Sequence, residues 1–350
     1  MHTHPSFIFL RRRASYLVAC IMAWSITACG PSQVKKTEQR TQPMTWTTSL
    51  FLDHPLVGQI WSSRERRMIG EQQLAQRLRS APIILIGERH DHPDHHVIQG
   101  RILQALPAGV LVGFEMLNLR DTAVVAKANS PESVRTLTNW DQSGWPSFNI
   151  YAPVFKALFE GGHQPAAVHP DRAHVRQSMM GPNSQAHSIG AYEGVLSPRG
   201  VAALRKDIDL SHCGYAPAGL VNAMMLAQEF KDRVMIKHLM APPGPKQRVL
   251  IAGNGHVRRD YGVPNHTDRS VISIGIMEVK PAQISPKDYG PHRYDYVWFT
   301  PRLDNLSPCE KYKKILEKMR VHHQKAPAKS SRSVAAPSPP KDEKSSAPKP

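Results

Sequence analysis

The chain has 350 residues, of which 41% are apolar, so it can bury the core of one large domain or of two. Its formal net charge of +17 is concentrated at the two ends: residues 1–28 contribute +3 and residues 311–350 contribute +8, which leaves +6 between them. No nucleic-acid recognition motif accompanies this charge, so a nucleic-acid-binding role is excluded.

The first 28 residues have the pattern of a lipoprotein signal peptide. Three arginines at 11–13 precede an apolar segment at 14–28 that is too short to span a membrane. Small residues then precede Cys29, as in a bacterial lipobox, where the cysteine is acylated with palmitate and becomes the first mature residue. An ordinary secretory signal cut near Ala28, or an uncleaved anchor, is the alternative. Since Gly30 is not the aspartate that commonly marks inner-membrane retention, we expect an outer-membrane lipoprotein that faces the periplasm.

The rest of the chain divides into a tether, a folded domain and a tail. The polar residues 29–48 are typical of a tether, and residues 49–310 are expected to form one α/β domain. Residues 321–350 are basic and rich in Pro, Lys and Ser, a composition that cannot bury enough apolar surface to fold. We therefore expect this tail to be disordered.

Predicted strands and helices alternate along the domain. Helices are expected, in chain order, at residues 64–78, 93–106, 118–139 with a break at 129–131, 154–159 and 218–240. Strands are expected at residues 83–86, 109–115, 165–168, 248–254, 271–279 and 294–300. Such alternation favours a mostly parallel central sheet flanked by helices. The mainly helical stretch 118–240 is expected to form a lobe over the strand ends, residues 140–153 an irregular aromatic segment and residues 178–200 a loop.

Two cysteines remain once Cys29 and the signal peptide are set aside. Cys213 and Cys309 could pair in an oxidising periplasm. They could equally be two unpaired buried thiols. The sequence leaves both possibilities open, because nothing in it brings the two residues together.

Polar side chains follow three of the predicted strands. Glu88 and His90 come after the first apolar run, Glu115 ends the second, and His256 and Arg258 follow a later one. If these strands are parallel neighbours, their carboxyl ends bring these side chains into one crevice. Two histidines with one or two carboxylates suit a divalent metal or a general acid/base pair at neutral pH. The alternative for each residue is a helix cap or a hydrogen-bonded turn.

Four motifs resemble the ChaN-type haem-binding lipoproteins of the wider Tiki group. They are Ile-Gly-Glu-Arg-His-Asp-His-Pro-Asp-His-His at 86–96, Gly-Phe-Glu-Met at 113–116, Ser-His-Cys-Gly at 211–214 with Ala227, Gln228 and Asp232 downstream, and Gly-Asn-Gly-His-Val-Arg at 253–258 with Gly-Val-Pro at 262–264. Their order matches that of the family over about residues 50–300. The resemblance implies that residues 49–310 bind haem for haem or iron uptake, as a homodimer with two cofacial haems.

The resemblance also implies a set of haem-binding residues. The family's iron ligand is a tyrosinate, assisted by a histidine from the partner subunit, and Tyr151 and Tyr215 are the two candidates here. A tyrosinate suits ferric haem, and a cation such as Arg258 suits the haem propionates. His90 and His256 complete the predicted set.

The wider group also includes metal-dependent hydrolases that use a Gly-x-x-His after the first strand and another late in the chain. Residues 87–90 and 253–256 fit both patterns. The alternative function is therefore a hydrolase of the peptidase or esterase type. In it, His90, His256 and Glu115 bind a divalent metal or act as acid and base, and Glu88 or Glu115 activates water. A third possibility is a surface scaffold whose basic tail contacts the cell wall or anionic lipid.

Overall fold

The structure is a computed structural model that describes residues 44–180, 195–241, 243–314 and 316–318, all within one unit of the chain. The predicted signal peptide with its lipidation site Cys29, most of the predicted tether and the predicted tail lie outside the described residues. Within the described residues, none of the helices combines the length and the apolar composition that crossing a bilayer requires.

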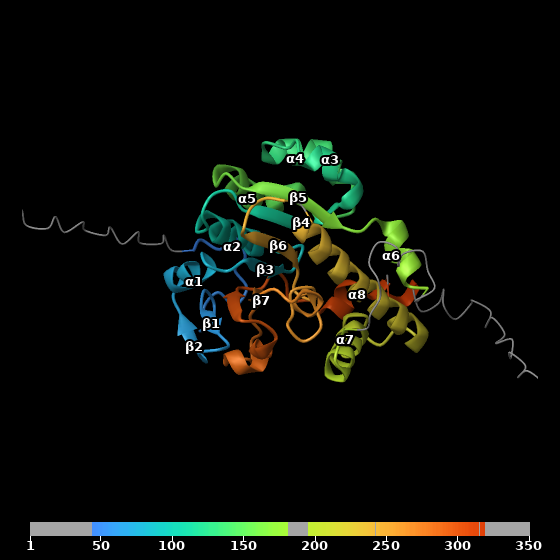
Figure 1. Ribbon diagram of the computed structural model, residues 1–350. Coiled ribbons are helices and arrows are strands. Elements are labelled where there is room, and N and C mark those ends of the chain that lie inside the picture. The colour runs from blue at the N-terminus through green and yellow to red at the C-terminus, as the bar shows by residue number, and fades with distance from the viewer. Residues whose placement is uncertain (1–43, 181–194, 242, 315, 319–350) are drawn as a thin grey trace, which may run out of the picture. The chain divides into compact units, whose positions relative to one another are not determined.

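The centre of the fold is one sheet with the strand order β2-β1-β8-β7-β3-β6-β4-β5 (Figure 1). Neighbours from β8 to β5 are parallel, and the β1–β2 hairpin adds to the β8 edge in antiparallel pairing. The strands are β1 Ile60–Ser62, β2 Arg67–Ile69, β3 Ile83–Glu88, β4 Leu111–Asn118, β5 Gln164–His169, β6 Arg248–Gly253, β7 Val271–Glu278 and β8 Tyr296–Thr300. The predicted α/β class with a mostly parallel sheet is confirmed.

Helices cover both faces of this sheet because its central strands are apolar on both sides. In β3, Ile84 and Ile86 pack into the cluster that includes α1, α2 and α5, whereas Ile83 and Leu85 pack into the cluster that includes α8. The helices are α1 Glu71–Leu78, α2 Pro93–Gln104, α3 Thr122–Val125, α4 Pro131–Leu137, α5 Phe148–Glu160, α6 Arg172–Ser178, α7 Pro198–Ser211, α8 Ala218–Met240 and α9 Pro308–Lys311. Helices α6 and α7 pack against α8 and form the helical lobe.

Two predicted elements differ from the structure. Residues 64–78 are not one helix: their first part forms a turn and β2, because Ile69 pairs with Ile60 across the hairpin, and only α1 is helical. The segment 140–153 is largely helical, since α5 begins at Phe148 with Ser147 as its cap and continues through Pro153. Sequence rules place a helix start after an internal proline, and here the proline is tolerated near the start of α5.

Candidate functional site

The predicted residues at the strand ends do meet at one edge of the sheet. Strands β3, β6 and β4 are neighbours, and Glu88 of β3 is directly paired with Gly253 of β6. His90 Nδ1 lies 2.8 Å from Glu88 Oε1, and His256 Nε2 lies 3.0 Å from Glu115 Oε1. The expected convergence of the four side chains is therefore present, and their chemical roles stay predictions.

Glycines make this close approach possible. A Cβ on Gly253 would lie 3.0 Å from His90 Nε2, and the Gly253 N–H donates a hydrogen bond of 2.8 Å to Glu115 Oε2. A Cβ on Gly87 would clash with the Asn254 side chain, which bonds to the backbone of Ile276 in β7. The glycines of both motifs thus admit side chains from neighbouring strand ends.

Glu88 is a fully buried carboxylate surrounded by donors. It accepts hydrogen bonds from Gln99 Nε2 at 2.6 Å and from the Tyr151 hydroxyl at 2.8 Å, besides its contact with His90. His96 Nδ1 lies 3.4 Å away. Burial alone would raise the pKa of Glu88, but His96 and His90 outweigh it and hold this pKa far below its ordinary value. Glu88 is therefore ionised at neutral pH.

Tyr151 lies beneath Glu88, inside the core. It projects from α5, is completely buried, and its ring contacts the ring of His96 at a centroid distance of 3.8 Å. Burial first, and the Glu88 carboxylate second, raise the pKa of Tyr151 far above its ordinary value. At this position Tyr151 is a neutral phenol that donates its proton to a hydrogen bond with Glu88.

His256 lies between two carboxylates. Its Nδ1 is 2.5 Å from Asp232 Oδ1 on α8, opposite the Glu115 contact on Nε2. Burial alone would lower the pKa of His256, but Glu115 and Asp232 outweigh burial and Lys231, and raise it to about 9. The protonated ring then donates from both nitrogens and offers no lone pair to a metal.

The charged residues form a continuous row from α8 to β3. The order is Asp232, His256, Glu115, His90 and Glu88, with 3.9 Å between His90 Nε2 and Glu115 Oε2. His90, whose side chain is 34% exposed, is the member that a ligand can reach most easily. Burial opposes its protonation, yet Glu88 and Glu115 raise its pKa. Among the described residues, no group of three or more His, Cys, Asp or Glu is arranged to hold a metal ion.

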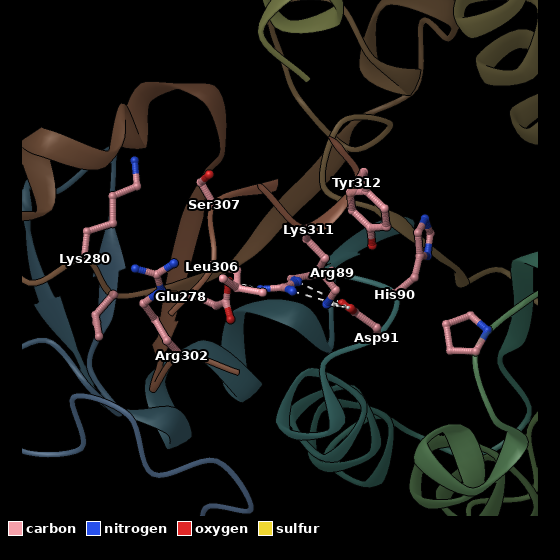
Figure 2. A pocket seen from close by; sticks show the side chains of 12 residues that line it. Arg89, His90, Asp91, Glu278, Lys280, Arg302, Leu306, Ser307, Lys311 and Tyr312 are labelled. Atoms are coloured by element: carbon pink, nitrogen blue, oxygen red, sulfur yellow. Dashed lines mark hydrogen bonds and ion pairs between the residues drawn. The ribbon is translucent and has the colours of Figure 1, made fainter. Parts of the chain in front are cut away.

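Two cavities lie on either side of this row. The first, here called the lobe cavity, has a volume of about 600 Å³ and is bounded by Glu115, Trp145 and residues of α6, α7 and α8. The second, called the rim cavity, has about 610 Å³ and includes His90 in its wall (Figure 2). The Trp145 and His90 rings are in edge contact with centroids 4.9 Å apart, so this pair helps to separate the two.

The lobe cavity combines apolar walls with basic groups. Its apolar lining comes from Val175, Met179, Ile208, Met224 and Ala227. Its polar lining includes the cations Arg172, Arg176 and Lys231 and the imidazoles His169 and His212. Burial lowers the pKa of His169 to about 4, so this ring is neutral at pH 7. The cavity is therefore suited to a large apolar ligand that carries negative charge.

His212 has one defined tautomer. Its Nδ1 lies 2.7 Å from the Ile208 carbonyl oxygen, which can only accept a hydrogen bond. The proton is therefore on Nδ1, and the lone pair of Nε2 is left for a ligand.

Two other predicted haem-binding residues lie away from both cavities. Arg258 is almost completely buried, its guanidinium pairs with Asp207 and Asp260, and it stacks 4.2 Å above the Tyr261 ring. Tyr215 is partly exposed in the turn between α7 and α8. Neither contributes to the lining of the lobe cavity or the rim cavity.

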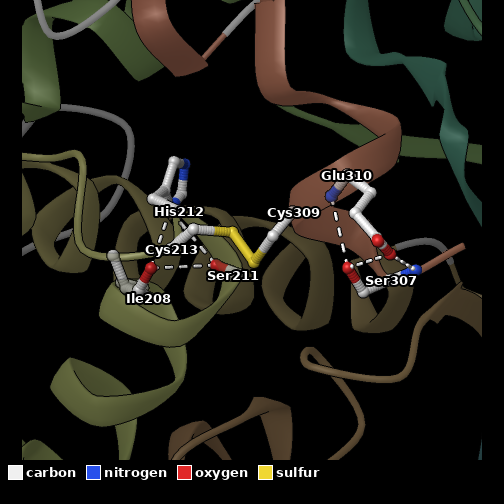
Figure 3. Close-up of a disulfide and its surroundings, with 7 residues drawn as sticks. All are labelled: Ile208, Ser211, His212, Cys213, Ser307, Cys309 and Glu310. Carbon is white, nitrogen blue, oxygen red and sulfur yellow. Dashed lines mark hydrogen bonds between the residues drawn. A yellow bond between two sulfur atoms is a disulfide. The ribbon is translucent and has the colours of Figure 1, made fainter.

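A disulfide connects the walls of the two cavities (Figure 3). Cys213 pairs with Cys309, with Cα atoms 5.8 Å apart and a separation of 96 positions in sequence. Cys213 directly follows His212 of the lobe cavity, and Cys309 lies between Ser307 and Lys311 of the rim cavity. Of the two possibilities that the sequence left open, the structure has the pairing.

Sequence reasoning gave no site role to three residues of the site, namely Trp145, His169 and Asp232. His169 ends β5, so the same strand-end argument that selected His90 could have selected it. Asp232 carried a signal too, because it belongs to one of the motifs on which the family resemblance depends, and in the structure it is fully buried on α8. Trp145 had no sequence signal beyond its place in an aromatic segment.

Comparison with known proteins gives a family and a fold. The model of the family described as haem-binding uptake, Tiki superfamily, ChaN, matches residues 74–267. Among solved structures, the chain is similar to ChaN of Campylobacter jejuni with cofacial haem binding, at 20% identity and a TM-score of 0.57, covering 68% of this chain and 95% of that one. Similarity to the type III effector HopBA1 is weaker, at 11% identity and a TM-score of 0.36 over 65% and 91% of the two chains, and supports no inference. No curated protein matches the sequence.

Proposed function

Because this chain belongs to the haem-binding uptake family ChaN of the Tiki superfamily, we propose that it binds haem for haem or iron uptake, and that the haem lies in the lobe cavity. The observation that carries this proposal is the composition of that cavity. Its volume of about 600 Å³ is in the range of cofactor sites, and its walls hold two methionines and several aliphatic side chains. Such walls suit a flat macrocycle that is apolar over most of its surface.

The cations of the lobe cavity suit the haem propionates. Arg172 and Arg176 are one turn apart on α6, and Lys231 projects from α8. A guanidinium can hold a carboxylate through two parallel hydrogen bonds, so this pair is the proposed propionate site. Arg258, which the sequence suggested for this role, already pairs with Asp207 and Asp260.

We propose iron ligands from the end of α7 and the turn that follows it. His212 Nε2 retains its lone pair at the cavity wall, and Tyr215 comes three residues later. Of the two tyrosines that the resemblance suggested, Tyr215 is proposed as the tyrosinate, because Tyr151 is buried and bonded to Glu88. Tyr215 does not line the lobe cavity, so this ligation requires the turn after α7 to move toward the haem. Bound iron would supply the redox and ligand-binding chemistry of haem, and these side chains would orient it.

A haemin titration tests the proposal. The wild-type chain should give a saturable Soret shift, and the Arg172→Gln/Arg176→Gln variant should bind roughly ten- to a hundredfold more weakly, since two charge-assisted contacts are lost. The Lys127→Gln/Arg199→Gln variant, which removes two exposed cations outside the cavity, is the control. His212→Ala and Tyr215→Phe should each change the Soret band if they ligate iron. Absence of a saturable shift in the wild type would refute the proposal.

We further propose that the protein is an outer-membrane lipoprotein anchored through Cys29, facing the periplasm, and that it is a homodimer with cofacial haems. The lipobox pattern and the family support the anchor, and the Campylobacter jejuni relative supports the paired haems. Palmitate labelling in cells should be lost in Cys29→Ala. Light scattering of the haemin-loaded chain should give twice the monomer mass, and a monomer would contradict the dimer.

The row of charged residues supports a second candidate function, a hydrolase. His90 and His256 alternate with Glu88, Glu115 and Asp232, and such alternation can deliver and remove protons. Since His256 is protonated and held by two carboxylates, acid/base use fits it better than metal ligation. Hydrolysis of ester or peptide substrates that is abolished in His90→Ala and His256→Ala, with haemin binding retained, would favour this function.

A further inference from the structure

The rim cavity has no part in the proposed haem site, yet it lies where α/β proteins usually bind ligands. Strands β3, β7 and β8 are neighbours, and the residues at their carboxyl ends line it (Figure 2). Arg89 and His90 follow β3, Glu278 ends β7, and Arg302 follows β8. Crevices at the carboxyl ends of parallel strands are the common ligand position in such sheets.

The acidic residues around the rim cavity are all occupied by two cations. Arg89 pairs with Asp91 at 2.8 Å, with Glu278 at 2.7 Å and with Asp304 at 3.0 Å. Lys311 pairs with Asp91 at 2.7 Å and with Asp304 at 3.0 Å. Three carboxylates thus face two paired cations, which leaves a formal charge of −1 in this cluster.

Two more cations of the cavity have no such partner. Lys280 and Arg302 each lie two residues beyond the paired residues Glu278 and Thr300 of β7 and β8. In the part of the chain that the structure describes, neither of them forms an ion pair. Figure 2 shows both side chains at the end of the cavity away from His90. With these two cations the charged groups around the cavity carry a net +1, from four cations and three carboxylates, and the end with Lys280 and Arg302 can attract an anionic group.

The rest of the cavity offers apolar surface. Val279, Leu306, Tyr312 and Pro146 contribute to its wall. Leu306 and Tyr312 are 51% and 45% exposed, so their apolar surface is open to a ligand. A tyrosine ring at the wall also suits stacking on a planar ligand.

We infer that the rim cavity binds a small molecule that carries a carboxylate or a phosphate on an aromatic body. The anionic group lies on Lys280 and Arg302, and the aromatic body packs against Leu306 and Tyr312 in the direction of His90. This site is separate from the lobe cavity, so it can be occupied whether or not haem is bound.

Calorimetric titration of the full chain with benzoate, benzylphosphonate and inorganic phosphate tests the inference. We expect saturable one-to-one binding of at least one of the two aromatic anions, benzoate and benzylphosphonate. The one that binds more tightly shows whether the site prefers a carboxylate or a phosphate-like group. Lys280→Gln/Arg302→Gln should weaken this binding roughly ten- to a hundredfold. Tyr312→Ala should weaken the binding of the aromatic anion and leave the binding of inorganic phosphate unchanged.

Matched measurements separate this outcome from a folding defect. The Lys127→Gln/Arg199→Gln control should bind the aromatic anion as the wild type does, and the Lys280/Arg302 variant should retain the wild-type circular dichroism spectrum and haemin titration. Failure of both aromatic anions to bind, equal weakening in both double variants, or loss of binding in haemin-saturated protein would each overturn the inference. The first two outcomes do not depend on whether the haem proposal is correct, and the third is measured only if the wild type binds haemin.

Discussion

A carboxylate that has lost its water must obtain equivalent hydrogen bonds from the protein, and Glu88 obtains them from His90, Gln99 and Tyr151. Gln99 lies on α2, Tyr151 on α5 and His90 in the turn after β3, and His96 of α2 lies 3.4 Å from the carboxylate. Glu88 therefore connects the sheet to both helices beneath the site. Its role is structural as well as chemical.

Replacing Glu88 with glutamine should show this structural role. The amide cannot accept all of these hydrogen bonds and leaves His90 without a counter-charge, so we expect the free energy of unfolding to fall by about 2–4 kcal/mol. Urea denaturation measures the change. Glu132→Gln, at a side chain that is 75% exposed, should change stability by little, and an equal loss in both variants would contradict the argument.

The elevated pKa of His256 makes stability depend on pH in a defined direction. A histidine whose pKa rises from 6.5 to about 9 on folding stabilises the fold fully below pH 6.5, and this contribution is lost as the pH rises through 9. We expect unfolding free energies to fall by about 3 kcal/mol over that window. Asp232→Asn should make the decline shallower. A wild-type profile that is flat from pH 6.5 to 9 would show that His256 is not protonated.

Gly253 allows a direct test of the contact between β6 and His90. Because a Cβ there would lie 3.0 Å from His90 Nε2, Gly253→Ala should displace the imidazole and cost about 1–3 kcal/mol of stability. Gly219→Ala is the matched control: no atom lies within 4 Å of its added Cβ, and the helical position should gain stability. Chemical shifts of the His90 ring would report the displacement directly.

At the scale of elements, the parallel strands could be predicted because each is an aliphatic run that must be buried on both faces. Ile83 to Ile86 and the strands β4, β6 and β7 all follow this rule. The hairpin at residues 60–69 could not, since its strands are three residues long and its pairing with β8 is a long-range contact. The start of α5 was hidden by Pro153, which sequence rules treat as a helix breaker.

The Cys213–Cys309 disulfide joins the end of α7 to α9 and closes a long loop. Loop-closure entropy predicts that its removal costs about 2–5 kcal/mol. Cys213→Ser/Cys309→Ser should therefore lower the melting temperature measured without reductant, and wild-type protein with reductant should match it. If both forms melt at the same temperature, the cross-link contributes nothing to stability.

For the whole molecule, the strand-end argument predicted Glu88, His90, Glu115 and His256, because parallel strands deliver their carboxyl ends to one edge. It did not find the lobe cavity, whose lining comes largely from helices that the sequence placed only in outline. The strand-end argument also could not predict the positions of Arg258 and Tyr151, because packing decides whether a polar residue faces a cavity or forms an ion pair. A pattern along the chain identifies which residues gather, and packing decides which of them remain accessible.

Among the described residues, those that line both cavities and form the disulfide lie between Arg89 and Tyr312. A chain that ends at residue 320 should therefore keep the haemin affinity and the unfolding free energy of the full chain. Titration and denaturation of the shortened protein measure this. A tenfold loss of haemin affinity would show that residues 321–350 contribute to the site.

Cys309 lies close to the end of the described residues, and its partner precedes it by 96 positions. The bond between them can close only after residue 309 has been synthesised, and only where electron acceptors for thiols are available. Maleimide gel-shift of the newly made protein in living cells would therefore report whether the chain has reached an oxidising compartment. Persistent alkylation at Cys213 would mark chains that are unfinished or retained in a reducing environment.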